Sequence, residues 1–226
     1  AGSSGVALKK EDGSIAWKSG RSESGYATGV LINIGEQQSV VLPVFRDIVA
    51  VNPKTGDVIW KFPWKTKYDI NAAEPIFSGD LMFISSGYEH GCALVKIDGS
   101  NATEIWQNKN MHNQMNSSVL WEGHLYGIDG QNDFRGKLRC IDFKTGQIKW
   151  SLDALGTGTL MLADGKLIIL GERGKLVIAE ASSDAFNEFS SKQILRGRCW
   201  TVPVLANGRI SARDADGNMV CVDVSG

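Results

Sequence analysis

The chain has 226 residues, 42% of them hydrophobic, and a formal net charge of −1 from 24 basic and 25 acidic side chains. A chain of this size can bury a substantial core, and its balanced charge gives no electrostatic support for a nucleic-acid partner or an anionic membrane surface. No apolar stretch approaches the roughly 18 residues of a membrane-spanning helix, and residues 1–5 lack the apolar core of a signal peptide.

An eleven-residue unit recurs along the chain. It reads Ala-Val-Asn-Pro-Lys-Thr-Gly-Asp-Val-Ile-Trp at residues 50–60 and returns at 7–17 and 140–150, with a small residue first, glycine seventh and tryptophan last. The alternating apolar residues, the Lys-Thr-Gly turn and the β-favouring run after it predict two strands joined by a turn. A looser copy ends at Trp106, and there we expect a longer turn over residues 97–103.

In chain order, these units predict a strand pair within residues 1–18 and then sets of four strands. The sets fall at about 24–62, 71–108, 115–152 and 157–192, and a partial set follows at 200–226. Hairpin glycines recur every 42 to 44 residues, at Gly79, Gly123, Gly165 and Gly208. Four antiparallel strands per period, with no helical stripe, are typical of β-propeller blades. The sequence therefore predicts one all-β propeller segment of about five blades over residues 1–226.

The frame Ala-x-Asn-x-Lys-Thr-Gly-x-x-x-Trp resembles the tryptophan-docking repeat of quinoprotein-like propellers, the pyrroloquinoline quinone (PQQ) repeat family. That family includes quinone-dependent alcohol dehydrogenases and the propeller lipoprotein of the outer-membrane β-barrel assembly machinery. Two segments, Ser-Ser-Gly-Tyr-Glu-His-Gly-Cys-Ala-Leu at 85–94 and His-Leu-Tyr-Gly-Ile-Asp-Gly at 124–130, more narrowly resemble secreted planctomycete-type proteins with PQQ-binding-like repeats.

The resemblance implies that the repeated tryptophans insert between neighbouring blades and that the turn glycines let the next blade approach closely. The residues given this structural role are Trp17, Trp60, Trp106, Trp150, Gly13, Gly56 and Gly146. It also implies a complete propeller of seven or eight blades, so further blades of the same protein are expected. A bacterial, extracytoplasmic location, in the periplasm or at the cell surface, is expected on the same ground.

Propeller topology gathers two kinds of connection on one face around the central channel, and the polar candidates lie in them. The candidate ligand-binding residues of this channel face are Tyr88, Glu89, His90, His112, Asn113, Asn116 and Trp200. His90 and His112 fall in adjacent blades, where they either share a ligand or bond loop backbone. No third ligand stands at a recognisable spacing, so no metal site is predicted. Residues 129–133 lack the spacing of a helix–loop–helix calcium site, and we expect a turn there.

Three functions remain open, and we favour a non-catalytic binding or scaffold module with a protein, small-molecule or glycan partner on the channel face, without a cofactor. The alternative is a PQQ- and calcium-dependent dehydrogenase whose remaining site residues lie outside this chain. The sequence has no adjacent cysteine pair, no aspartate that maps to the catalytic one, and only Trp200, expected at the start of a strand, as a floor for the quinone. A glycan-binding propeller is the third hypothesis, motivated by Tyr26, Tyr68, Tyr88 and Trp200.

Cys140 and Cys221 occupy the first position of the repeat, which holds a small residue in each copy, and both are expected to be buried.

Overall fold

The computed structural model describes residues 4–114, 116–131, 135–153 and 155–225, and all regular elements among them are β-strands. The strands form antiparallel sheets in which strands adjacent in sequence are also neighbours in space. The predicted all-β architecture of four-stranded antiparallel blades is confirmed.

Four sheets have four strands each, ordered as they occur in the chain. The first contains β3 (Val30–Ile34), β4 (Gln37–Pro43), β5 (Asp47–Val51) and β6 (Val58–Pro63). The second contains β7 (Ile76–Ser78), β8 (Leu81–Ser86), β9 (Gly91–Asp98) and β10 (Asn101–Asn108). The third contains β11 (Val119–Trp121), β12 (His124–Asp129), β13 (Lys137–Asp142) and β14 (Ile148–Leu152). The fourth contains β15 (Thr159–Ala163), β16 (Lys166–Leu170), β17 (Lys175–Glu180) and β18 (Glu188–Gln193).

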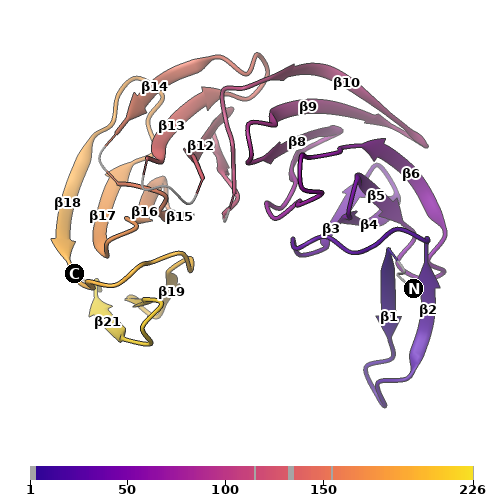
Figure 1. The fold of residues 1–226 in the computed structure, drawn as a ribbon, viewed down its shortest axis with the longest axis horizontal. Helices are drawn as coiled ribbons and strands as arrows, with labels where there is room; N and C mark the ends of the chain where they lie inside the picture. The colour runs from indigo at the N-terminus through magenta and orange to yellow at the C-terminus, as the bar shows by residue number, and fades with distance from the viewer. Residues whose placement is uncertain (1–3, 115, 132–134, 154, 226) are drawn as a thin grey trace.

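Two smaller sheets flank them. A hairpin of β1 (Gly5–Leu8) and β2 (Ile15–Ser19) precedes the first four-stranded sheet, and β19 (Val204–Ala206), β20 (Arg209–Arg213) and β21 (Met219–Asp223) follow the fourth. Figure 1 shows the sheets following one another around an open arc, with β6, β10, β14 and β18 on its outer rim. The hairpin and the three-stranded sheet form the two ends of this arc, so the described chain does not close a ring.

The repeat has the same backbone geometry in each copy. The seventh-place glycine donates its N–H to the carbonyl of the third residue, at 2.8 Å for Gly56 and Asn52 and again at 2.8 Å for Gly146 and Asp142. Both glycines have positive φ, +77° and +68°, where a Cβ would be strained. One extra residue then shifts the register of the strand pair, as at Ala50/Val51. The same register shift occurs in the copies at residues 7–17 and 140–150, so the turn glycine and the tryptophan have the same position in the strand pair of each copy.

The expected long turn at residues 97–103 is wrong. β9 continues through Asp98 and β10 begins at Asn101, so that these two residues face each other across a two-residue turn. Gly99 takes a φ of +59°, which permits the tight connection. The additional residues lengthen the two strands instead of the turn.

The outer-strand tryptophans contact the turn of the following sheet. The indole N–H of Trp17 donates to the carbonyl of Pro53 at 2.9 Å, and that of Trp106 donates to Lys144 at 2.8 Å. Trp150 bonds the carbonyl of Ser182 in the same way at 2.9 Å. Trp60 is only 4% exposed and belongs to a core cluster that spans the first two four-stranded sheets. Adjacent sheets are therefore joined both by an apolar core and by a directed hydrogen bond.

The repeat also explains one wrong prediction, since Cys221 is exposed although Cys140 in the same place is buried. Cys140 lies opposite Trp150 on the outer strand of its sheet. In the described chain β21 has no such outer neighbour, because its sheet contains only three strands. The burial of this position depends on the fourth strand and not on the residue itself.

Candidate functional site

The channel face is built by two kinds of connection that touch each other. They are the segments that follow each outer strand and the loops that join the second and third strands of each sheet. Contacts between the two kinds recur along the arc, as in the pairs Arg46–Asp69, Tyr68–Tyr88, His112–Asp129 and Glu172–Trp200. Each side chain considered below is therefore held by two loops on a rigid set of sheets.

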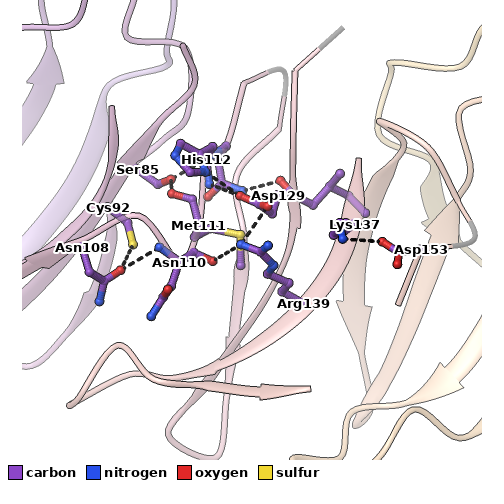
Figure 2. Close-up of polar contacts among 12 residues, drawn as sticks. Ser85, Cys92, Asn108, Asn110, Met111, His112, Asp129, Lys137, Arg139 and Asp153 are labelled. Carbon is purple, nitrogen blue, oxygen red and sulfur yellow. Dashed lines mark hydrogen bonds and ion pairs between the residues drawn. The ribbon is translucent and has the colours of Figure 1, made fainter. Parts of the chain in front are cut away.

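His112 is fixed by a buried carboxylate. Asp129, at the end of β12, accepts hydrogen bonds from the backbone N–H of His112 at 2.9 Å and lies 2.7 Å from its ring Nδ1 (Figure 2). The other Asp129 oxygen lies 2.8 Å from Nη1 of Arg139, which also donates to the carbonyl of Asn110 at 2.9 Å. The triad ties the segment after β10 to β12 and β13, so its first role is to hold the loop.

His90 has a different environment from His112. Its ring meets that of Trp64 edge to face at 4.3 Å between centroids, and its Nε2 atom is buried without a hydrogen-bond partner in the described chain. Burial lowers the pKa of His90, and His112 and Lys109 lower it further by repulsion. His90 is therefore neutral at pH 7. Among the described residues, His90 and His112 have no hydrogen-bond partner in common.

The described residues contain no group of three or more histidine, cysteine, aspartate or glutamate side chains that could hold a metal ion. The predicted turn over residues 129–133 lies partly outside the described residues, because Asn132 and Asp133 are not among them. Within the described part, Asp129 is occupied by His112 and Arg139. Its carboxylate thus has partners within the protein.

Two predicted ligand-binding residues are buried and bonded to the protein itself. Asn113 donates its side-chain amide to the carbonyl of Ile128 at 3.1 Å, and its carbonyl accepts from Ser118 at 2.9 Å. Asn116 donates to the carbonyl of Gly158 at 3.2 Å. Buried amides that satisfy backbone groups stabilise loops, and we do not include these two in a ligand site.

Tyr88 is half-buried and Glu89 is exposed, and both have an unusual backbone conformation. Both have left-handed φ values, +54° and +61°, in the turn that joins β8 to β9. The Tyr88 ring meets Tyr68, from the segment after β6, edge to face at 4.7 Å between centroids. Tyr68 is 55% exposed, and the structure brings it beside a predicted site residue.

Trp200 is in the segment before β19 and not at the start of a strand. Its indole N–H donates to Oε1 of Glu172 at 3.2 Å, and the Arg198 guanidinium lies over its ring at 4.7 Å from the centroid. Glu172 is only 1% exposed, and its Oε2 accepts the backbone N–H of Thr157 at 2.9 Å. Beside them is a cavity of about 490 Å³, the arginine cavity, lined by Glu172, Arg173, Arg196, Gly197, Arg198, Ala215 and Asp216.

Sequence reasoning did not include two residues that organise this face, Trp64 and Arg139. Trp64 supports His90 and donates its indole N–H to Ser86 at 2.8 Å, which in turn donates to Asn71 at 3.1 Å. The sequence signal for Trp64 was its place four residues after Trp60, outside the repeat frame. Arg139 lies within β13, where the sequence indicates only an ordinary strand residue. Nothing in the sequence marks it as the partner of Asp129.

Comparisons with known proteins agree with this architecture. The BamB structure from Moraxella catarrhalis is 15% identical with a TM-score of 0.71, over 96% of this chain and 65% of that one. Saccharomyces cerevisiae Sqt1 is 14% identical with a TM-score of 0.68, over 98% of this chain and 65% of that one. The computationally designed Ika8 protein is 10% identical with a TM-score of 0.66, over 94% of this chain and 62% of that one.

At such identities the similarity establishes the fold alone, and the chain spans less than two thirds of each of these three proteins. No curated protein matches the sequence. Among the described residues there is no helix with the length and apolar character needed to cross a membrane. A family model described as outer membrane protein assembly factor BamB matches residues 1–152, about two thirds of the chain. The chain thus belongs to this BamB family of PQQ-repeat β-propellers.

Proposed function

We propose that this chain is a non-catalytic propeller module that binds a protein partner on its channel face. The family supports this function, because its model is described as an outer membrane protein assembly factor. The same description supports an extracytoplasmic location in a bacterium. The fold supports binding in general, since stacked sheets hold two sets of loops in fixed positions.

The observation that carries the proposal is the charge of the arginine cavity. Its lining contains three arginines, Arg173, Arg196 and Arg198, against two acids, Glu172 and Asp216. Glu172 is buried, accepts hydrogen bonds from the Trp200 indole and the Thr157 amide, and lies 3.9 Å from Arg198. The arginines of the lining outnumber its acids by one, so the net charge of the cavity is positive, and an acidic segment of a protein is the ligand that fits it.

The described residues give the dehydrogenase alternative no specific support. Arg198 covers one face of the Trp200 ring and Glu172 accepts its indole N–H, which leaves the opposite ring face for a stacked group. The described part of the chain also lacks a cluster of metal-binding side chains. We therefore derive no reaction from this face.

We also propose that the protein contains further blades that continue the arc. The exposed position of Cys221 supports this, because the same place is buried at Cys140 under an outer strand. The solved propellers that this chain matches are longer than it is. An added outer strand beside β21 would cover Cys221 and the exposed Met219.

The test of the docking site is a fluorescence-anisotropy titration of the chain with a labelled ten-residue polyglutamate peptide. We expect saturable binding that weakens with salt and falls roughly tenfold in Arg196→Glu, a loss of about 1.4 kcal/mol. The matched control is Arg209→Glu, which reverses an exposed arginine that begins β20 and pairs with Asp223 at 3.8 Å. Equal binding by the two variants, or no binding by the wild type, would reject the arginine cavity as the docking site.

A further inference from the structure

Six non-glycine residues in the described part of the chain have a left-handed backbone, and they are distributed unevenly. Three of them, Glu122, Asp164 and Asn207, each precede a glycine in a tight hairpin, where such a conformation is usual. The other three, Asp69, Tyr88 and Glu89, lie together on the channel face at the junction of the first two four-stranded sheets. Strained backbone of this kind is retained where surrounding contacts enforce it, and it concentrates at ligand sites.

The contacts that enforce it are visible around the tyrosine pair, Tyr68 and Tyr88. Asp69 receives two hydrogen bonds from Arg46, from Nε at 2.9 Å and from Nη2 at 3.0 Å. This bidentate pair fixes the residue next to Tyr68, and the backbone N–H of His90 closes the Tyr88–Glu89 turn on the carbonyl of Gly87 at 3.2 Å. The exposed ring of Tyr68 and the half-buried ring of Tyr88 are thus held nearly perpendicular to each other by two different loops.

The chemistry around the pair selects an uncharged ligand. Arg46 and Asp69 neutralise each other, and the Arg46 hydrogen bonds lower the pKa of Asp69. The Lys67 ammonium lies over the Tyr68 ring, 5.3 Å from its centre, and the exposed Glu89 follows Tyr88 in the chain, so the pair is bordered by one cation and one anion as well. An anion would meet Asp69 and Glu89, and a cation would meet Arg46 and Lys67, so neither charge is favoured.

A pyranose ring combines an apolar C–H face with hydroxyl groups at its edge. Tyrosine offers a large apolar ring face with a polar tip, and the Arg46–Asp69 pair offers planar donors and acceptors beside it. We propose that the tyrosine pair and the Arg46–Asp69 pair form a binding site for neutral oligosaccharides. This site is built by the first two four-stranded sheets and is independent of the arginine cavity, which is lined by the fourth sheet and the loops of the last one.

The test is isothermal titration of the wild-type chain with cellohexaose, maltohexaose, xylohexaose and chitohexaose, with trigalacturonic acid and a decaproline peptide as comparison ligands. We expect saturable binding of at least one neutral hexasaccharide, weakened roughly tenfold or more in Tyr68→Ala. Tyr68→Phe keeps the ring and should bind within a few fold of the wild type. The matched control is Phe189→Ala, which removes an aromatic side chain that is 60% exposed on β18 and should leave affinity unchanged.

Each alternative result overturns the proposal in a different way. No heat with any neutral hexasaccharide removes the site, and binding of trigalacturonic acid or decaproline alone assigns the pair to another ligand class. A Tyr68→Ala variant that binds as tightly as the wild type places the sugar elsewhere. Tyr68→Ala truncates an exposed side chain, and an unchanged near-ultraviolet circular dichroism spectrum outside the tyrosine band will verify its fold.

Discussion

The close approach of successive sheets can be tested at Gly146, the turn glycine beneath the Trp106 indole. A Cβ at this position would lie 2.4 Å from Nδ2 of Asn108, 2.8 Å from Cη2 of Trp106 and 2.9 Å from Cζ3 of Trp106, all closer than packed atoms approach each other. Gly13 is the ideal control, because it has the same place in the repeat and a similar φ, +72° against +68°, but a Cβ there would meet nothing within 4 Å. Alanine at either position carries the left-handed backbone cost of about 1–2 kcal/mol.

Gly146→Ala carries in addition the cost of overpacking, about 1–3 kcal/mol. Its melting temperature should therefore lie about 2–12 °C below that of Gly13→Ala, given a shift of about 2–4 °C per kcal/mol for a chain of this size. Circular dichroism at 218 nm during heating measures both variants. In a Trp106→Leu background the excess cost of Gly146→Ala should become smaller, and the part that remains comes from the contact with Asn108. Equal melting temperatures for the two single variants in the wild-type background would refute the argument that the indole requires glycine at this place.

Three further predictions concern burial. Trp60→Ala should lower the free energy of unfolding by about 3–5 kcal/mol because the side chain is 4% exposed in a core cluster, and an unchanged urea midpoint would contradict this. The pKa of His90 is lowered in the folded protein by burial, then by His112 and Lys109, so the unfolded chain binds more protons and stability should fall as pH drops below about 6.5. His90→Gln should reduce that fall, as followed by melting temperature between pH 7.5 and 5. At pH 8 a thiol reagent should label Cys221 alone in the native chain. The other three thiols, Cys92, Cys140 and Cys199, are buried, and burial raises their pKa values to about 12, 11 and 11. These three should react only after the chain is unfolded.

The fold was accessible from the sequence because its main determinant is local and repeated. A turn glycine and a tryptophan four residues later define a strand pair wherever they occur, and three copies set the period without knowledge of any contact. The turn at Gly99 shows the limit of this reasoning. Extra residues between two periodic markers can extend either the turn or the strands, and only the facing of Asp98 and Asn101 in the structure decides between them.

The candidate sites were less accessible, because they depend on pairs of loops separated by a whole strand or more. His112 was recognised as a polar loop residue, but its partner Asp129 was expected in a turn and Arg139 in a strand. In the sequence Asn113 also resembled a ligand-binding residue, but in the structure its side-chain amide donates to the carbonyl of Ile128. A polar side chain faces solvent or makes a buried hydrogen bond depending on which loop packs against it. The sequence does not identify that loop, because no motif marks it at a fixed number of residues from the side chain.

The repeat separates the residues that stabilise the propeller from those that can bind. Outer-strand tryptophans join several successive sheets, and the close contacts that a Cβ would make at Gly56 and Gly146 explain why substitution of these turn glycines should be costly. The two proposed binding sites instead use residues that occur once, the arginine cavity around Glu172 and the tyrosine pair beside Asp69. Each lies between two loops of the channel face. A protein built in this way can present a protein-docking site and a sugar site on the same face, and Arg196→Glu and Tyr68→Ala should each remove one of them without affecting the other.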